Sequence, residues 1–356
     1  MNDIRVMIVD DSAFMRLTLK AMIEEDPFLK VVATARNGSD ALTKLDRFHP
    51  DVITLDILLT GNRDGLAVLR EIMAVRPTPT IMVSGAGGEN AVIEALGSGA
   101  FDFIAKPNGR PSEIGRIESE LQTKIRQAAE TKIRPDAAHP DQTADGEIEQ
   151  KTAALSRMGF PSLIFIGTST GGPKALQLVV PGLKIGLPAP ILIVQHMPAQ
   201  FTKSLADRLD RMSRVKVSEA FEGEVLENGN VYIAPGGFHT RLLENENGRL
   251  VVRLSQDPPV HGVRPSVDVA LNSLDRIRHR SYVVAILTGM GKDGASGLSR
   301  LKKSNRHVFA IAEARQSCVV FGMPKAAIET KQVDLVCPLG RVAESICSQY
   351  AFRGDE

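Results

Sequence analysis

The stretch Leu163-Ile164-Phe165-Ile166-Gly167-Thr168-Ser169-Thr170-Gly171-Gly172-Pro173 decides how the second half of the chain folds. Its apolar run predicts a buried strand, its glycines allow a sharp turn, and Pro173 suits the first turn of a helix. Strand, turn and helix in this order build a parallel sheet covered by helices. The sequence therefore predicts a doubly wound, mostly parallel α/β sheet, with further strands at Ile191–Val194, Tyr282–Leu287, Val308–Ile311 and Asp334–Val336.

A different pattern interrupts this half between about residues 215 and 254. Two alternating runs, Thr240–Leu243 and Leu250–Leu254, flank the dipeptide Asn247-Gly248. This dipeptide is a strong signal for a tight hairpin turn. We expect an antiparallel hairpin set into the otherwise parallel sheet.

The first half shows the same alternation of strands and helices. A long amphipathic stretch, Ser112–Ile133, follows the last of its predicted strands. Five strands with five helices match the smaller doubly wound, flavodoxin-like fold. The predicted strands are Val6–Val9, Val31–Ala35, Val52–Leu55, Thr80–Val83 and Phe101–Ile104.

Between the two halves the apolar pattern fades. The segment Pro135-Asp136-Ala137-Ala138-His139-Pro140-Asp141 is polar and interrupted by proline, which is typical of an exposed linker. We therefore predict a first domain over residues 1–134, a linker over 135–158 and a second domain over 159–350.

Composition excludes several classes of protein. A chain of 356 residues with a net charge of +1 fits two domains and carries no large basic surface for nucleic acid. No apolar run reaches the length of about 20 residues that a membrane helix needs. We expect a cytoplasmic protein without membrane insertion. The three cysteines, Cys318, Cys337 and Cys347, are expected to be buried thiols, not disulfides or metal ligands.

Polar side chains gather at the ends of the predicted strands of the first half. Asp10 and Asp11 follow the first strand, Asp56 the third, Ser84 the fourth and Lys106 the fifth. The carboxyl ends of parallel strands meet at one edge, so these groups converge. Carboxylates at such a site suit Mg²⁺, and one of them can accept a phosphoryl group that Lys106 and Ser84 then contact.

These residues give the first half, from residue 1 to about 134, a resemblance to response-regulator receiver domains. The resemblance implies that Asp56 is phosphorylated, that Asp10, Asp11, Asp56 and the carbonyl of Leu58 bind Mg²⁺, and that Ser84 and Lys106 form the switch pair. One loop departs from the family pattern Asp-x-x-Met-Pro-x-x-Asp-Gly. Around Leu59-Thr60-Gly61 the proline is missing, and the glycine, Gly65, comes one residue late. We expect this loop to influence Mg²⁺ affinity and phosphorylation.

The turn after the first strand of the second half has the spacing of a nucleophile elbow. Gly167-x-Ser169-x-Gly171 would expose the Ser169 hydroxyl, with helix amides nearby to stabilise an oxyanion. The alternative is a glycine-rich phosphate-binding loop. That loop would need a lysine at the place of Pro173, since Lys174 comes one residue late.

A histidine and an aspartate favour catalysis over phosphate binding. His196 follows the strand Ile191–Val194, and Asp293 follows Tyr282–Leu287, so both lie at the same predicted sheet edge as Ser169. A serine needs a base to take its proton, and the base needs an orienting carboxylate. Rivals for these roles without the same strand-end placement are His239, His261, Asp257 and Asp268.

Residues 160 to about 350 resemble the catalytic domain of the chemotaxis protein-glutamate methylesterase family, CheB. The motifs that carry the resemblance are Gly167-Thr168-Ser169-Thr170-Gly171-Gly172, Gln195-His196-Met197-Pro198, Tyr232-Ile233-Ala234-Pro235-Gly236, Arg264-Pro265-Ser266-Val267-Asp268, Leu287-Thr288-Gly289-Met290-Gly291 with Asp293-Gly294, and Cys318-Val319-Val320-Phe321-Gly322-Met323-Pro324.

The resemblance implies Ser169 as nucleophile, His196 as base and Asp293 as orienting carboxylate. Thr170 and the amide of Met290 would help to position the reaction. It further implies hydrolysis of glutamate methyl esters on methyl-accepting chemotaxis receptors, deamidation of receptor glutamines, and phosphorylation by the histidine kinase CheA. The esterase chemistry would need no cofactor. Two alternatives stay open: a second half that only binds a partner such as DNA, and an esterase for another protein's glutamyl ester.

Overall fold

The protein was analysed as a computed structural model, which describes residues 3–59, 64–85, 87–106, 111–131, 162–277, 280–305 and 307–350. The chain forms two compact units, Met1–Ala137 and Ala138–Glu356, and each is described by itself. The predicted linker lies almost wholly outside the described residues. The predicted domain bounds therefore stay a prediction.

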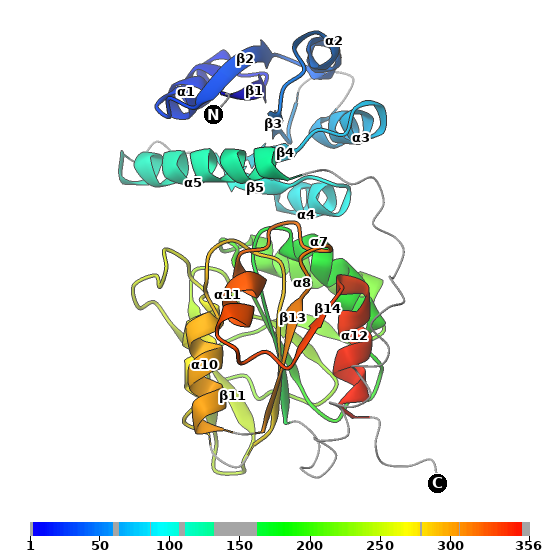
Figure 1. Ribbon diagram of the computed structural model, residues 1–356, viewed down its shortest axis with the longest axis vertical. Helices are drawn as coiled ribbons and strands as arrows, with labels where there is room; N and C mark the ends of the chain where they lie inside the picture. Colours follow the sequence, from blue (N-terminus) through cyan, green and yellow to red (C-terminus); the bar gives the residue numbers. More distant parts are fainter. Residues whose placement is uncertain are drawn as a thin grey trace. The chain divides into compact units, whose positions relative to one another are not determined.

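The first unit is a five-stranded sheet with flanking helices (Figure 1). All pairs of neighbouring strands are parallel, in the order β2-β1-β3-β4-β5. The first four predicted strands agree with β1 to β4, and the fifth begins one residue later than predicted. The elements are β1 Ile4–Val9, α1 Ala13–Glu24, β2 Leu29–Ala35, α2 Gly38–Phe48, β3 Val52–Asp56, α3 Gly65–Val75, β4 Thr80–Ser84, α4 Glu89–Gly97, β5 Asp102–Ala105 and α5 Pro111–Glu130.

Local sequence explains where the first helices begin. Ser12, Asn37 and Asp64 each precede a helix, and their side chains accept backbone amides of the first turn. Such caps contribute about 1 kcal/mol each, because they satisfy amides that the helix itself leaves unpaired. Chain order reverses between β1 and β3, so the loops after these two strands form the edge where a ligand site is expected.

The second unit is built on a seven-stranded sheet in which every pair of neighbouring strands is parallel. The strand order is β14-β13-β12-β6-β7-β9-β8. Its elements are β6 Leu163–Thr168, α7 Gly172–Val179, the 3₁₀ turn η2 Val180–Gly182, β7 Ile191–Gln195, α8 Phe201–Met212, β8 Val217–Glu219, β9 Val231–Ile233, β10 His239–Glu244, β11 Leu250–Ser255, α9 Val267–Leu274, β12 Tyr282–Ile286, α10 Ala295–Ser304, β13 Val308–Glu313, α11 Met323–Glu329, β14 Leu335–Cys337 and α12 Leu339–Ser348.

The antiparallel hairpin is confirmed, but it is not inserted into the large sheet. Strands β10 and β11 pair with each other as a separate two-stranded sheet, from His239 opposite Ser255 to Glu244 opposite Leu250. Helix α9 packs against both β10 and α10. The α/β fold class is therefore as predicted, and the hairpin lies against helix α9.

Helices cover both faces of the large sheet. Helix α10 contacts α9 and α11, whereas α7 contacts α8 and α12, and Figure 1 shows α10 and α12 on opposite sides of the strands. The central strands β6 and β12 are wholly buried, and Phe165 and Tyr282 are among the largest buried side chains. Chain order reverses at the β6–β12 pair, which places the loops after these strands at a switch point.

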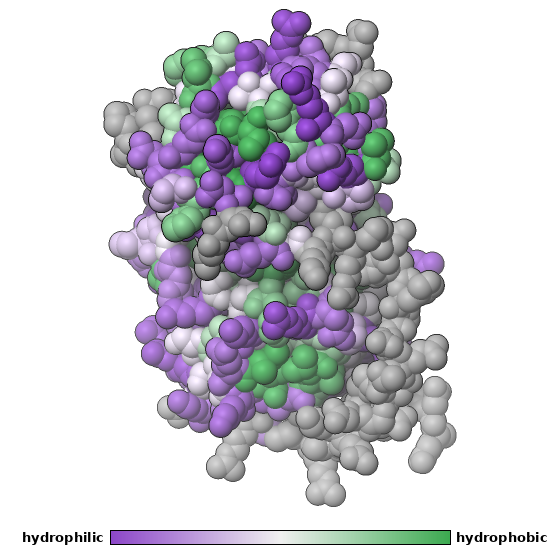
Figure 2. Space-filling model, turned by 45° about the horizontal axis from the view of Figure 1, so that its top comes forward, coloured by the Kyte–Doolittle hydropathy of each residue, from purple (hydrophilic) through white to green (hydrophobic). Residues whose placement is uncertain are grey.

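The surface is mixed in character. Hydrophilic residues cover most of the coloured surface in Figure 2, and hydrophobic residues gather in separate patches. Within the described ranges, no helix combines the length and the apolar character that crossing a membrane requires.

Candidate active site

The loop after β6 holds the candidate nucleophile. Ser169 begins the turn, its carbonyl accepts the amide of Gly172 at 2.7 Å, and α7 starts immediately afterwards. Gly171 has a φ of +79°, and a Cβ atom there would lie 2.5 Å from Cβ of Val319. Only glycine fits this position without strain, and the sharp turn therefore leaves the Ser169 side chain half-buried at the sheet edge.

His196 and Asp293 are joined across 97 residues of sequence. His196 follows β7 and Asp293 precedes α10, and the Nε2 atom of His196 lies 2.8 Å from Oδ2 of Asp293. Both side chains are buried, at 8% and 3% exposure. A buried imidazole held by a carboxylate is oriented in one direction, as a general base must be.

The carboxylate of Asp293 accepts three further hydrogen bonds. The hydroxyl of Ser266 and the amide of Asp268 donate to Oδ1 at 2.9 Å each, and the amide of Val267 donates to Oδ2 at 2.7 Å. Burial alone would raise the pKa of Asp293, but the bond to His196 and these amides hold that pKa below its ordinary value. Asp293 is therefore ionised and fixed beside the imidazole.

Gln195 connects the backbones of the two loops that carry Ser169 and His196. Its Nε2 donates to the carbonyls of both residues at 3.0 Å, and the amide of His196 donates to the carbonyl of Thr168 at 3.1 Å. Gln195 had no predicted role, although a glutamine at the end of an apolar strand is a signal that the sequence offers. The described residues provide no hydrogen-bond partner for the Ser169 hydroxyl, so transfer of its proton to His196 stays a prediction.

The residues expected to position the reaction lie next to Ser169. Thr170 is buried, and its carbonyl accepts the hydroxyl of Thr288 at 3.0 Å. Met290 follows Gly289, where an added Cβ would lie 2.8 Å from Cβ of Ser169. The segment that carries the Met290 amide thus touches the nucleophile.

The rival residues have other partners. His239 is fully buried, and its Nε2 lies 3.1 Å from the carbonyl oxygen of Pro258. Asp257 is exposed and pairs with Arg241 at 2.8 Å. His261 and Asp268 form a second histidine–aspartate pair at 3.2 Å, but its imidazole is 41% exposed.

Asp268 also has a structural task. Its Oδ1 accepts the amides of Gly294 at 2.9 Å and Gly297 at 2.6 Å, at the start of α10. Burial raises its pKa, although those amides and His261 act against that effect. Asp268 therefore holds the start of α10, the helix that follows Asp293.

In the first unit, the candidate phosphorylation residues converge as predicted for strand ends. Asp10 and Asp56 are buried, and Nζ of Lys106 lies 2.7 Å from Oδ2 of Asp56 and 3.1 Å from Oδ2 of Asp10. Carboxylate oxygens of Asp10, Asp11 and Asp56 lie within 4.8 Å of one another. Ser84 is buried at the end of the neighbouring strand β4, where its hydroxyl donates to the carbonyl of Gly85 at 3.1 Å.

The charges at this cluster fit a divalent cation. Burial raises the pKa of Asp10, against the lowering effect of Lys106, whose Nζ faces Oδ2 of Asp10 at 3.1 Å, and of the Ser12 amide. Burial would lower the pKa of Lys106, but Asp56 and Asp10 raise it. The amide of Leu58 donates to Oδ1 of Asp56 at 3.2 Å. The altered part of the loop, residues 60–63, lies outside the described residues.

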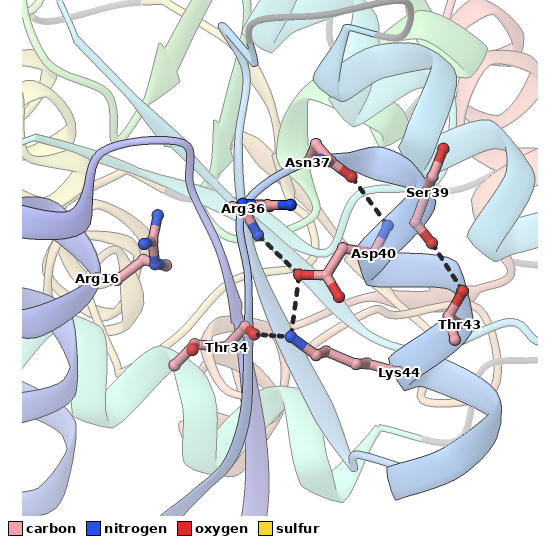
Figure 3. A pocket seen from close by; sticks show the side chains of 8 residues that line it. All are labelled: Arg16, Thr34, Arg36, Asn37, Ser39, Asp40, Thr43 and Lys44. Atoms are coloured by element: carbon pink, nitrogen blue, oxygen red, sulfur yellow. Dashed lines mark hydrogen bonds and ion pairs between the residues drawn. The ribbon is translucent and has the colours of Figure 1, made fainter.

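A polar pocket of about 610 Å³ lies beside this cluster, between α1, the end of β2 and the start of α2 (Figure 3). Arg16 lines it and donates to the carbonyls of Asp10 at 2.7 Å and Asp11 at 3.0 Å. Lys44 pairs with Asp40 at 2.9 Å on its other side. Arg16, on the wall of the pocket, therefore holds the backbone of the loop that carries Asp10 and Asp11.

Comparison with known proteins identifies both units. Residues 164–346 match the family model described as CheB methylesterase, and residues 6–117 match the model described as response regulator receiver domain. The second unit resembles the crystal structure of the Thermotoga maritima CheB methylesterase catalytic domain, with 44% identity and a TM-score of 0.50. That match covers 52% of this chain and 97% of the other.

Similarity to curated proteins extends over nearly the whole chain. The sequence is 44% identical over 349 residues to a protein-glutamate methylesterase/protein-glutamine glutaminase of Geobacillus kaustophilus, which covers 97% of this chain and 98% of the relative. It is 45% identical over 354 residues to a protein of the same name from Symbiobacterium thermophilum, with 96% of each chain covered.

Proposed function

This chain belongs to the CheB methylesterase family and carries a response-regulator receiver domain, and on that premise we propose that it is a phosphorylation-regulated protein-glutamate methylesterase. It hydrolyses glutamate 5-methyl esters on chemotaxis receptors, releases methanol, and deamidates receptor glutamines. The observation that carries the proposal is the buried hydrogen bond between His196 and Asp293 at the edge where Ser169 lies.

In the proposed reaction, Ser169 attacks the ester carbonyl while His196 takes its proton. The bond to Asp293 occupies Nε2 of the imidazole, so Nδ1 is the atom that accepts the proton. Asp293 fixes the ring and stabilises the imidazolium that forms. Gln195 supports this geometry by tying the two loops together.

Charge that develops on the carbonyl oxygen is stabilised by the amide of Met290, with Thr170 helping to position the group. Donors of this kind contribute about 3–4 kcal/mol each to transition-state stabilisation. Methanol leaves with the proton held by His196, and water then hydrolyses the acyl-enzyme. A receptor glutamine follows the same steps with ammonia as the leaving group.

The test is methanol release from membranes that carry methylated receptors. Replacement Ser169→Ala removes the nucleophile and is expected to abolish release. Ser304→Ala, at an exposed position on α10, is the matched control and is expected to keep the wild-type rate. Release by Ser169→Ala at near the wild-type rate would refute the assignment of the nucleophile.

The receiver is proposed to control this reaction through phosphorylation of Asp56. Asp10, Asp11 and Asp56, with the carbonyl of Leu58, would hold Mg²⁺, which neutralises charge on the phosphoryl group when bound. Lys106 already contacts Asp56 and remains close enough to pair with that group. Support for this comes from the clustering of the three carboxylates, of which Asp10 and Asp56 are buried, because carboxylate oxygens gathered in this way suit Mg²⁺.

Regulation is tested with acetyl phosphate and Mg²⁺. These additions are expected to raise the esterase rate of the wild type and to leave Asp56→Asn unchanged. Asp46→Asn, at an exposed position on α2, is the control and is expected to respond like the wild type. Equal stimulation of Asp56→Asn would contradict the proposal. The proposed phosphodonor is the kinase CheA, and the proposed place of action is the cytoplasm.

A further inference from the structure

Glu313 is a buried carboxylate near the candidate active site that the proposed chemistry does not use. It ends β13, the neighbour of β12, and is 0% exposed. Its Oε2 accepts the backbone amide of Thr288 at 2.8 Å, and its Oε1 has no hydrogen-bond partner among the described residues. A buried acid without a cation is costly to keep, which favours a specific role over simple packing.

Thr288, whose amide Glu313 accepts, is hydrogen-bonded to the loop that carries Ser169. Its carbonyl accepts the amide of Ser169 and the hydroxyl of Thr168, both at 3.0 Å. Its own hydroxyl donates to the carbonyl of Thr170 at 3.0 Å. Thr288 therefore links the carboxylate of Glu313 to three consecutive residues of the loop, 168 to 170.

The segment after Thr288 is equally confined. The amide of Gly289 donates to the carbonyl of Val320 at 3.0 Å, and the carbonyl of Gly289 accepts the amide of Met323 at 2.8 Å. The next residue is Met290, whose amide is the proposed oxyanion donor. Thr288 is thus the common origin of the contacts that place the nucleophile and of the segment that carries the donor.

We propose that Glu313 is a positioning residue for the esterase: by holding the amide of Thr288, it fixes the Ser169 loop and the Met290 amide in one geometry. This inference rests on the proposed function, because it assigns a supporting role for the same reaction. Without an acceptor at residue 313, the Thr288 amide is buried and unpaired, and the segment shifts to find another partner.

The protonation of Glu313 provides an independent readout. Burial raises the pKa of Glu313 to about 7, against the lowering effect of Thr288, Ser317 and Cys318. The titratable groups that its charge acts on are the thiols of Cys318 and Cys337. An ionised carboxylate accepts an amide more strongly than a protonated one does. The hydrogen bond from the Thr288 amide to Glu313 therefore strengthens as the pH rises through about 7.

The test compares Glu313→Leu with Glu313→Gln in the full chain, by kcat and KM for methanol release. Leucine removes the acceptor and is expected to lower kcat at least about tenfold with KM nearly unchanged. Glutamine keeps an acceptor oxygen and is expected to retain most of the activity below about pH 7, where the wild-type carboxyl is itself protonated. Glu329→Leu, at an exposed position on α11, is the matched control and is expected to behave like the wild type.

The pH profile keeps the test decisive if Glu313→Leu does not fold. The ratio of the wild-type kcat to that of Glu313→Gln is expected to rise about threefold or more as pH passes through neutrality, because only the wild type ionises there. A constant ratio, or a wild-type kcat in folded Glu313→Leu, overturns the inference. Ser169→Ala, measured in parallel, separates this from failure of the proposed function: activity in that variant overturns the function itself.

Discussion

Replacing Asp293 with asparagine isolates the charge behind His196. Asparagine keeps the shape of the side chain, but one of its two polar groups donates hydrogen bonds and cannot accept them. Asp293 accepts bonds on both oxygens, from His196 and Val267 on Oδ2 and from Ser266 and Asp268 on Oδ1. At least two of these bonds are lost, whichever way the amide turns.

The expected loss of activity is large. Without the carboxylate, the imidazole loses its orientation and the imidazolium its counter-charge, which lowers kcat by about 10³–10⁴-fold, or about 4–5 kcal/mol. The assay is methanol release from methylated receptor membranes, with the melting temperature as a check on folding. Asp257→Asn, at an exposed carboxylate paired with Arg241, is the control and is expected to remain fully active.

The pair His261–Asp268 allows a comparison that could refute this assignment. His261→Gln is expected to stay active because its imidazole is 41% exposed, whereas His196→Gln, at an imidazole only 8% exposed, is expected to be inactive. The reasoning is wrong if Asp293→Asn and His196→Gln keep wild-type rates while His261→Gln loses activity. In that case the second pair, with Asp268, would carry the chemistry.

Two further predictions concern residues that shape the site. Gly289→Ala is expected to lower kcat at least about tenfold, because its new Cβ would lie 2.8 Å from Cβ of Ser169 and 2.5 Å from Sδ of Met323. The measurement is the kinetics of methanol release. An unchanged kcat would show that the close approach of Gly289 to Ser169 is not needed for activity. Glu313 has a folded-state pKa raised from 4.5 to about 7, so its contribution to stability is full at low pH and falls as pH rises through that range, by up to about 3 kcal/mol. Glu313→Gln removes this loss, so its melting temperature is expected to rise relative to the wild type between about pH 5 and pH 8, and parallel melting curves would contradict the pKa.

Sequence patterns predicted the long strands well because burial imposes apolar runs. The predicted strand Ile191–Val194 corresponds to β7, Ile191–Gln195, and the hairpin turn at Asn247-Gly248 lies between β10 and β11. Strands β8 and β9 were missed. Each has only three residues, too few for a periodic signal, and each is stabilised by pairing with a neighbour distant in sequence.

The meeting of His196 and Asp293 was predictable from the sequence, whereas their supporting contacts were not, and the role of Ser169 stays a prediction. The rule that sites lie at the carboxyl ends of parallel strands indicated Ser169, His196 and Asp293 together. It could not show that Ser266 and the start of α9 surround Asp293, because those bonds connect residues 25 to 27 positions apart. Gln195 and Glu313 each end an apolar run, and a polar residue at that place was the signal available in the sequence.

The most direct test of the central claim is covalent labelling of the full chain with a fluorophosphonate, followed by peptide mass spectrometry. We predict a single adduct on Ser169, formed at least about a hundredfold more slowly in His196→Gln because the base that activates the hydroxyl is gone. An adduct on a different residue, or labelling of Ser169 at the same rate in both proteins, would contradict it.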